Sequence, residues 1–232
     1  MGEGADVILR AATWIVPLTI AIVFHEVAHG LTARHFGDMT AAKAGRLTLN
    51  PLRHVDPVGT VILPLILAVS GAPVFGWAKG VPVRADRLRN PRWHMVLVAL
   101  AGPASNVILA ALAALAIGLL VRMGAGPDTP LALFLAKNLD NFLLINLFLA
   151  VFNMLPIPPF DGSRVLGGLL PPALAQPYRQ LDRFGLFIVL GLLVLLPAIA
   201  PGRNLVGDIV VPPTDMLLRV AYDFAAMIGG IR

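Results

Sequence analysis

Residues 93–121 read WHMVLVALAGPASNVILAALAALAIGLLV, a run of 29 residues without Asp, Glu, Lys or Arg. About 20 apolar residues are enough for a helix to cross a bilayer, so this run predicts a transmembrane helix. Comparable stretches cover 11–33, 141–160 and 184–202, and Glu26 is the only formal charge among them. We therefore expect an all-α polytopic membrane protein, a helical bundle of about four to six transmembrane segments.

The composition of the whole chain agrees with a membrane protein. Of its 232 residues, 57% are hydrophobic and only 13% are charged, and the mean hydropathy is +0.81. Soluble domains carry about 25% charged residues, so a soluble enzyme, a disordered regulator and a nucleic-acid-binding module are excluded. We expect one membrane-embedded domain over 1–232, with a core at about 11–170. Residues 171–232 would form accessory helices and an amphipathic C-terminal segment, whose charges at 215, 219 and 223 suit an interfacial helix.

The apolar segment 58–71 is expected to behave differently from the longer runs. It has only 14 residues, contains Pro64, and leads into a Gly/Pro-rich stretch that reaches Pro82. Apolar runs of about 10–14 residues more often re-enter or stay buried than span the membrane. We expect a re-entrant loop, for which a β-hairpin is one form, and a short true span is the alternative.

Charge also favours the re-entrant reading. Residues 34–92 hold nine Lys/Arg and 156–183 hold three, against one in 1–10 and two in 122–140. The positive-inside rule places the two richer regions in the cytoplasm. Both can lie on that side only if 58–71 does not cross the bilayer. The +5 net charge then reflects orientation, and no nucleic-acid partner is expected.

The chemical signal lies in the first apolar run. Residues 24–30 read FHEVAHG and contain the pattern H-E-x-x-H. On a helix, His25 and His29 share a face, so both imidazoles can bind one Zn²⁺ while Glu26 lies beside the activated water. Glu26 is one of only two glutamates in the chain, and an ionisable residue within a membrane helix is a functional candidate.

A catalytic zinc site needs a third protein ligand. His35 has the right spacing for one soluble zincin pattern, but Thr32 replaces the glycine that would turn the chain, so His35 would continue along the helix about 9 Å past His29. Asp161 is the better candidate, because the prolines in NMLPIPPFDG (153–162) break the helix before it. The alternative for Asp161 is a helix cap.

Together these motifs resemble the site-2 protease family of intramembrane zinc metalloproteases, in its small bacterial form without a PDZ domain. Phe160, where the family often has Leu, is a mild departure. The resemblance covers roughly 20–170 and is carried by HEVAHG (25–30), NPLRHVDP (50–57), GWAKGVPV (76–83), AGPASN (101–106) and NMLPIPPFDG (153–162).

The resemblance implies one Zn²⁺ per chain, bound by His25, His29 and Asp161, with Glu26 as general base. It implies hydrolysis of peptide bonds within or near transmembrane helices of membrane protein substrates. It also implies a multi-pass protein of the bacterial cell membrane, with its active site toward the cytoplasm and with the lipid bilayer and a transmembrane substrate as partners. A non-catalytic protein of the same fold and, less well supported, a metal transporter are the alternatives.

Four further residues leave two readings each. Asn153 could donate to substrate or to the oxyanion, or make an interhelical hydrogen bond. Asn106 has the same two readings, and we favour the structural one because it lies among small residues that allow close packing. His54 suits a turn or a contact with substrate. Arg164 could pair with a ligand carboxylate or with a lipid phosphate.

Overall fold

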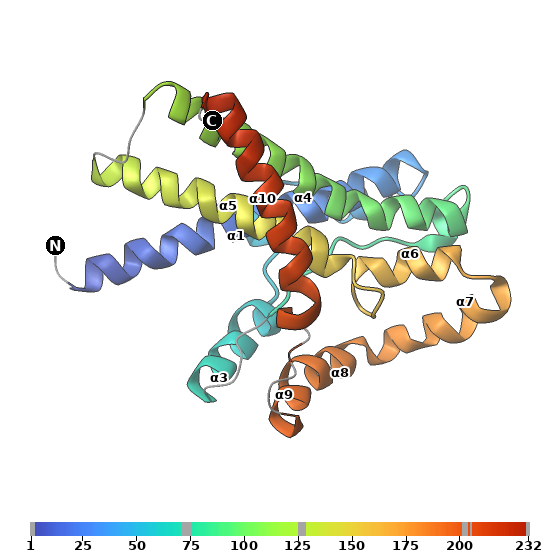
Figure 1. Ribbon diagram of the computed structural model, residues 1–232. Coiled ribbons are helices and arrows are strands. Elements are labelled where there is room, and N and C mark those ends of the chain that lie inside the picture. Colours follow the sequence, from blue (N-terminus) through green and yellow to red (C-terminus); the bar gives the residue numbers. More distant parts are fainter. Residues whose placement is uncertain (1–2, 71–75, 125–128, 201–203, 205, 231–232) are drawn as a thin grey trace.

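The computed structural model describes residues 3–70, 76–124, 129–200, 204 and 206–230 (Figure 1). Regular structure in these ranges is helical, and none of the described residues forms a strand. The expected β-hairpin is therefore not formed by the described part of the Gly/Pro-rich stretch, while residues 71–75 of that stretch lie outside the described residues. The expectation of an all-α fold is confirmed.

Among the described residues, three helices are long and apolar enough to cross a membrane. They are α1 (Glu3–His35), whose apolar part is Ala11–His35, α4 (Pro91–Arg122) and α5 (Pro130–Asn153). Helix α5 differs from the predicted run 141–160, because it begins eleven residues earlier and ends at Asn153. Its first turns include Lys137 and Asp140, which a search for charge-free runs leaves out.

Apart from α10 (Val211–Gly229), the other elements of the described ranges are short. The predicted run 184–202 is divided among the consecutive helical segments η4, α8, η5 and α9, so it does not add a fourth long helix to the described ranges. The short elements are α2 (Thr40–Lys43), η1 (Pro51–Arg53), η2 (Pro57–Ile62), α3 (Leu63–Ser70), η3 (Ala85–Arg87), α6 (Asp161–Leu169), α7 (Pro172–Arg179), η4 (Gln180–Phe184), α8 (Gly185–Leu190), η5 (Gly191–Leu195), α9 (Leu196–Ile199) and η6 (Val206–Val210).

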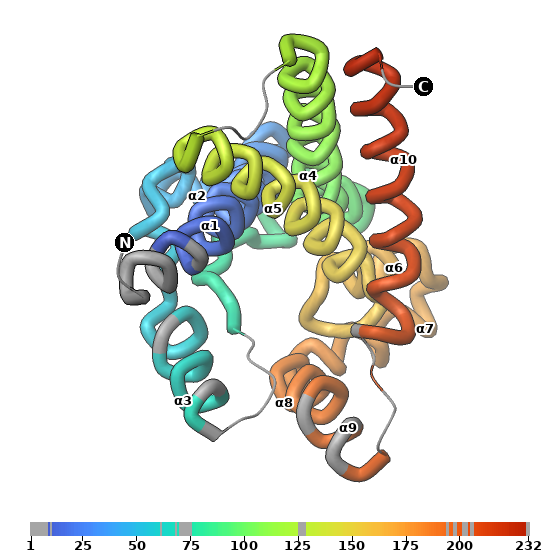
Figure 2. Tube along the Cα trace, turned by 60° about the vertical axis from the view of Figure 1, so that its left-hand side comes forward, coloured from blue at the N-terminus to red at the C-terminus, as the bar shows by residue number. Residues whose placement is uncertain are grey.

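Helix α4 is the centre of the bundle. It packs against α1, α5, α6 and α10 (Val211–Gly229), as the two views show (Figures 1 and 2). Small side chains allow this close packing. The main core cluster joins α4, α5 and α10 through Ala110, Ala113, Ala114, Leu143, Leu147 and Ala225.

Helix α10 is amphipathic, as expected, but it packs along α4 and α5 rather than lying apart from the bundle. Its buried Ala225 belongs to the main core. The charged stripe Asp215, Arg219 and Asp223 stays exposed. A stripe of charges on a helix identifies the face that is directed at solvent. It does not identify what packs on the other face, so the contact of α10 with α4 and α5 could not be predicted from the sequence.

The segment that contains η2 and α3 begins and ends close to the same point of the fold. The Trp77 amide donates to Gly59 O at 3.1 Å, and the Thr60 hydroxyl donates to Trp77 O at 2.9 Å. The two ends of the excursion are therefore side by side. This geometry agrees with the expected re-entrant segment.

The returning segment 76–84 is then fastened to the residues that follow α1. Its Lys79 amide donates to His54 O at 2.8 Å, and its Arg84 amide donates to Asp38 Oδ2 at 2.6 Å. Asp38 is fully buried and also accepts hydrogen bonds from the amide and hydroxyl of Thr40. Burial alone would favour the neutral carboxyl, but these hydrogen bonds hold the pKa of Asp38 below its usual range.

We expect Asp38→Ala to destabilise the protein by roughly 1–3 kcal/mol, because buried amides lose their acceptor. Since the folded-state pKa is lowered, the contribution of Asp38 is present above the unfolded-state pKa, about 3.9, and is lost as pH falls through the folded-state value. Melting temperatures in detergent should therefore fall more steeply for wild type than for Asp38→Ala as pH drops below about 4.

The matched control is Asp86→Ala. Asp86 pairs with Arg84 on the exposed surface, where ion pairs contribute little. Equal effects of the two substitutions on stability would contradict the assignment of Asp38 as the anchor of 76–84.

Candidate metal centre

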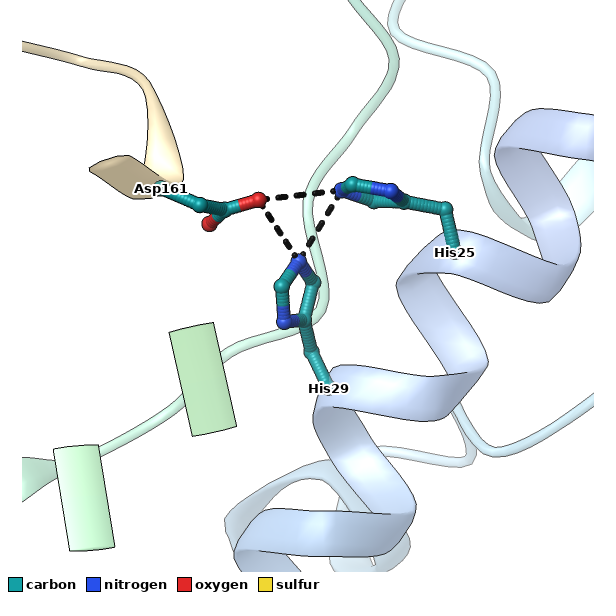
Figure 3. A group of neighbouring side chains, drawn as sticks. All are labelled: His25, His29 and Asp161. Carbon is teal, nitrogen blue, oxygen red and sulfur yellow. Dashed lines mark hydrogen bonds and ion pairs between the residues drawn. The ribbon is translucent and has the colours of Figure 1, made fainter. Parts of the chain in front are cut away.

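Three buried side chains from two distant segments meet inside the bundle. His25 and His29 come from α1, and Asp161 is the first residue of α6 (Figure 3). Asp161 Oδ2 lies 3.1 Å from each Nε2, and the two Nε2 atoms are 3.0 Å apart. At most 6% of any of these residues is exposed. The structure therefore brings together the three predicted metal ligands.

The other nitrogen of each imidazole is already engaged. His29 Nδ1 lies 2.7 Å from Val98 O on α4, and His25 Nδ1 lies 2.6 Å from Asn106 Oδ1 on the same helix. A backbone carbonyl can only accept a hydrogen bond, so His29 carries a proton on Nδ1. Its Nε2 then has a free lone pair when the ring is neutral.

No arrangement of protons satisfies all three edges of this triangle. If both rings are neutral, three lone pairs face one another around Asp161 Oδ2, which has no hydrogen-bond donor. One added proton leaves one imidazole nitrogen facing the carboxylate without a hydrogen. Two added protons place N–H against N–H at 3.0 Å. A single cation bound by all three atoms removes the conflict.

The donor set fits zinc. Two imidazoles and one carboxylate form a ligand set found in catalytic zinc sites, which leave a fourth position open. Tetrahedral bonds of about 2.0–2.1 Å place neighbouring ligand atoms about 3.3 Å apart, close to the observed 3.0–3.1 Å. His25, His29 and Asp161 form the one such group found among the described residues.

Asp161 reaches the site because the chain breaks after α5. The Gly162 Cα lies so close to the end of α5 that an added Cβ would be 2.2 Å from Met154 O. Glycine is therefore required for α6 to begin there. Arg164 donates from Nη1 to Asp161 Oδ1 at 3.3 Å, which places Arg164 with the ligand carboxylate. Asp161 makes no cap hydrogen bond, because the N-cap of α6 is Phe160.

Glu26 lies beside the triangle rather than in it. Its half-buried carboxylate accepts a hydrogen bond from the Val81 amide at 2.6 Å. Residues 76–84 therefore run past the residue that the sequence predicts to be the base. This contact was not expected from the sequence, because 55 residues separate its partners.

Gly102 on α4 makes room for both imidazoles. An added Cβ there would lie 2.4 Å from His29 Nε2 and 2.6 Å from His25 Cε1. One face of α4 is directed at the histidines. It carries Val98, Gly102 and Asn106, which are spaced by four residues. The motif AGPASN thus forms part of the metal centre.

The remaining predicted residues have structural contacts. His35 is exposed at the end of α1 and stays outside the metal group, as expected. His54 is buried, with Nε2 2.9 Å from Thr48 O, so it holds a turn. Asn153 donates to Leu149 O in its own helix at 2.9 Å, and its contact with substrate stays a prediction.

Asn146 was missed in the sequence. It is fully buried on α5 and accepts a hydrogen bond from Asn106 at 2.8 Å. The available signal was a second amide inside an apolar helix, where polar groups require partners. Spacing along the sequence could not reveal which partner it has.

The bundle and the triangle define a class: a membrane protein with several long apolar helices and a buried His–His–Asp group that could hold a metal ion. The chain is similar to a Bacillus subtilis protein named "Putative zinc metalloprotease YwhC", with 41% identity over 201 residues, covering 82% of this chain and 87% of the relative. No family model and no solved structure matches the chain.

Two further relatives carry the same kind of name. Rip2 of Mycolicibacterium smegmatis is 32% identical over 187 residues, covering 81% of this chain and 67% of the relative. MJ0611 of Methanocaldococcus jannaschii is 32% identical over 152 residues, covering 66% and 68%. The chain belongs to this family of zinc metalloproteases. Membership agrees with the zinc ligands inferred from the geometry.

We expect Gly102→Ala to weaken zinc binding by about tenfold or more, because the new methyl group forces apart rings that are held at their Nδ1 atoms. Zinc affinity of the purified protein can be measured by competition with a chromophoric chelator.

Gly118→Ala, on the same helix, is the matched control. Its added Cβ would lie 2.6 Å from Ala225 O and disturb the packing of α4 on α10. This variant should lose stability and keep its zinc affinity. Loss of affinity in both variants would mean that Gly102 acts through the packing of α4 and not on the metal centre.

Proposed function

We propose that the protein is an intramembrane zinc metalloprotease that hydrolyses peptide bonds within or near transmembrane helices, like the site-2 proteases that its motifs resemble. The observation that carries this proposal is the buried His25–His29–Asp161 triangle inside a bundle of membrane-spanning helices. A metalloprotease that acted on soluble chains would have no need for ligands on such helices.

The depth of the triangle supports an intramembrane reaction. His29 lies six residues before the end of α1, and Val98, its partner on α4, lies seven residues after that helix begins. At 1.5 Å per residue, both positions are about 10 Å inside the ends of their helices. His25 is about 6 Å deeper. These depths are a substantial part of a hydrocarbon core that is about 30 Å thick.

The chain's own residues divide the chemistry among them. Zinc, when bound by the triangle, supplies Lewis-acid polarisation of the scissile carbonyl and acidifies water. Glu26 accepts the proton of the attacking water and returns it to the leaving amine. The Val81 amide fixes the position of the Glu26 carboxylate. Arg164 donates to Asp161 Oδ1, while Oδ2 of the same carboxylate faces the histidines, so Arg164 holds the carboxylate in place.

The substrate must present an extended peptide bond, because a helix hides its carbonyl groups in its own hydrogen bonds. Residues 76–83 have no regular structure and run beside Glu26. We infer that this segment offers an edge on which an unwound part of a transmembrane substrate is held. Lys79 and Gly80 in the middle of this segment are exposed residues.

The proposed setting is the bacterial cell membrane, with several crossings and the site near the cytoplasmic side. The basic region 34–92 begins at the end of α1 that carries His29. Two of its arginines donate hydrogen bonds there, Arg84 from its amide to Asp38 and Arg89 from its side chain to His35 O. Positive charge at this end supports a cytoplasmic orientation.

Glu26→Gln tests the mechanism. Glutamine keeps the size of the side chain and an acceptor for the Val81 amide, but it cannot take up a proton. We expect the variant to bind zinc like wild type and to cleave a helical transmembrane reporter, in reconstituted liposomes, at least about 100-fold more slowly.

Glu3→Gln changes the other glutamate of the chain and should leave cleavage unchanged. Unaltered cleavage by Glu26→Gln would refute the role of Glu26. Absence of cleavage by wild-type protein that is loaded with zinc would favour a non-catalytic protein of the same fold.

A further inference from the structure

We propose that Asn106 and Asn146 are positioning residues for the metal centre. Together they form an amide relay, defined here as the hydrogen-bond chain from Phe142 O through Asn146 and Asn106 to His25 Nδ1. The relay holds His25 with a proton on Nδ1 and with its Nε2 lone pair directed at the metal. This inference rests on the proposed zinc centre and adds two residues outside the ligand set.

The relay is continuous, and its two asparagines are buried from solvent. Both asparagines are 0% exposed. Asn146 Nδ2 donates to Phe142 O at 2.8 Å, Asn106 Nδ2 donates to Asn146 Oδ1 at 2.8 Å, and Asn106 Oδ1 lies 2.6 Å from His25 Nδ1. Three helices, α5, α4 and α1, are linked in this way at the level of the metal centre.

The first member of the relay determines the direction of all the others. Phe142 O can only accept, so the Asn146 amide nitrogen must face it and the Asn146 oxygen must face Asn106. Asn106 then turns its nitrogen to Asn146, where Ala21 O at 3.3 Å is a second acceptor for the same group. Its oxygen is left facing His25, whose Nδ1 must therefore carry the hydrogen.

The two histidines thus reach the same tautomer by different means. His29 donates directly to a backbone carbonyl, Val98 O. His25 lies one turn deeper, where its partner on α4 is the Asn106 side chain. A side-chain amide can point either way, and Asn146 removes this freedom. When a group that orients a metal-binding imidazole in this manner is removed, metal affinity commonly falls by about 10- to 100-fold.

Polar residues between membrane helices also serve simply to hold helices together. The two roles differ in what they change. A purely structural contact would alter stability and leave the tautomer of His25 and the zinc affinity alone. The relay requires that both respond when either asparagine is replaced.

The experiment compares Asn106→Leu and Asn146→Leu with Asn138→Leu in detergent-solubilised full-length protein. Asn138 is a close control, because it also lies on α5 and donates to the carbonyl four residues earlier, Phe134 O at 2.9 Å. We expect the first two variants to bind zinc about 10- to 100-fold more weakly. Asn138→Leu should stay within about twofold of wild type.

Asn106→Asp provides a conservative rescue. A carboxylate at this position still accepts from His25 Nδ1, so zinc affinity should stay within about threefold of wild type, although the bonds to Asn146 and Ala21 are lost. A drop as large as that of Asn106→Leu would indicate that packing alone matters.

The second readout is the tautomer of His25, measured by ¹⁵N–¹H correlation spectra of metal-free protein at a pH where imidazole is neutral. Wild type should carry the proton on Nδ1, and the two Leu variants should lose this preference. Wild-type protein with the proton on Nε2 would overturn the proposal even if a variant failed to fold. Unchanged zinc affinity and tautomer in both Leu variants would also overturn it.

These outcomes separate the inference from the proposed function. If wild type binds no zinc, the proposed metalloprotease fails, while the tautomer still reports on the relay. If wild type binds zinc and cleaves its reporter but the Leu variants behave like Asn138→Leu, the relay fails and the proposed function stands.

Discussion

Three electron-rich atoms held 3.0–3.1 Å apart in a buried site form the constraint on which this structure depends. Without a cation between them, the lone pairs of His25, His29 and Asp161 would repel one another, or some of these groups would lack a hydrogen-bond partner. The bundle resists that tendency with direct restraints on each group: Val98 O on one imidazole, Asn106 on the other, and Arg164 on the carboxylate. Each proposed ligand is therefore held by a neighbouring protein group, and such restraint would lower the cost of ordering the ligands around a metal.

Helix α4 makes this preparation possible. The residues that face α1 are small where the imidazoles lie and polar where an imidazole needs a partner. Gly102 lies against both rings, and Asn106 is the partner of His25. Farther along, Ala110, Ala113 and Ala114 pack α4 closely against α5 and α10. One helix thus combines a site and a packing surface, which explains why its motif AGPASN stands within an otherwise featureless apolar run.

Much of this could be predicted because local chemistry constrains it. The four-residue spacing places His25 and His29 on one face, and the prolines before Asp161 require the break that brings this residue to them. The hydrogen bonds that join Gly59 and Thr60 to Trp77 agree with the re-entrant course expected from the short length of 58–71 and from the distribution of charge. The start of α5 could not be predicted in this way, since Lys137 and Asp140 interrupt the apolar run without ending the helix. Asn146 was beyond reach for another reason, because its partner is 40 positions away and only tertiary packing selects it.

The central claim is that one zinc ion is bound by two imidazoles and one carboxylate within the membrane domain, and zinc K-edge X-ray absorption of the purified protein tests it most directly. The account predicts one zinc per chain, two imidazole nitrogens at about 2.0–2.1 Å and oxygen in the remaining shell. Because the chain has no cysteine, sulfur should be absent from that shell. In His29→Ala the imidazole scattering should fall to one ring or the zinc should be lost. Zinc bound through oxygen alone, or a spectrum that His29→Ala leaves unchanged, would contradict the account.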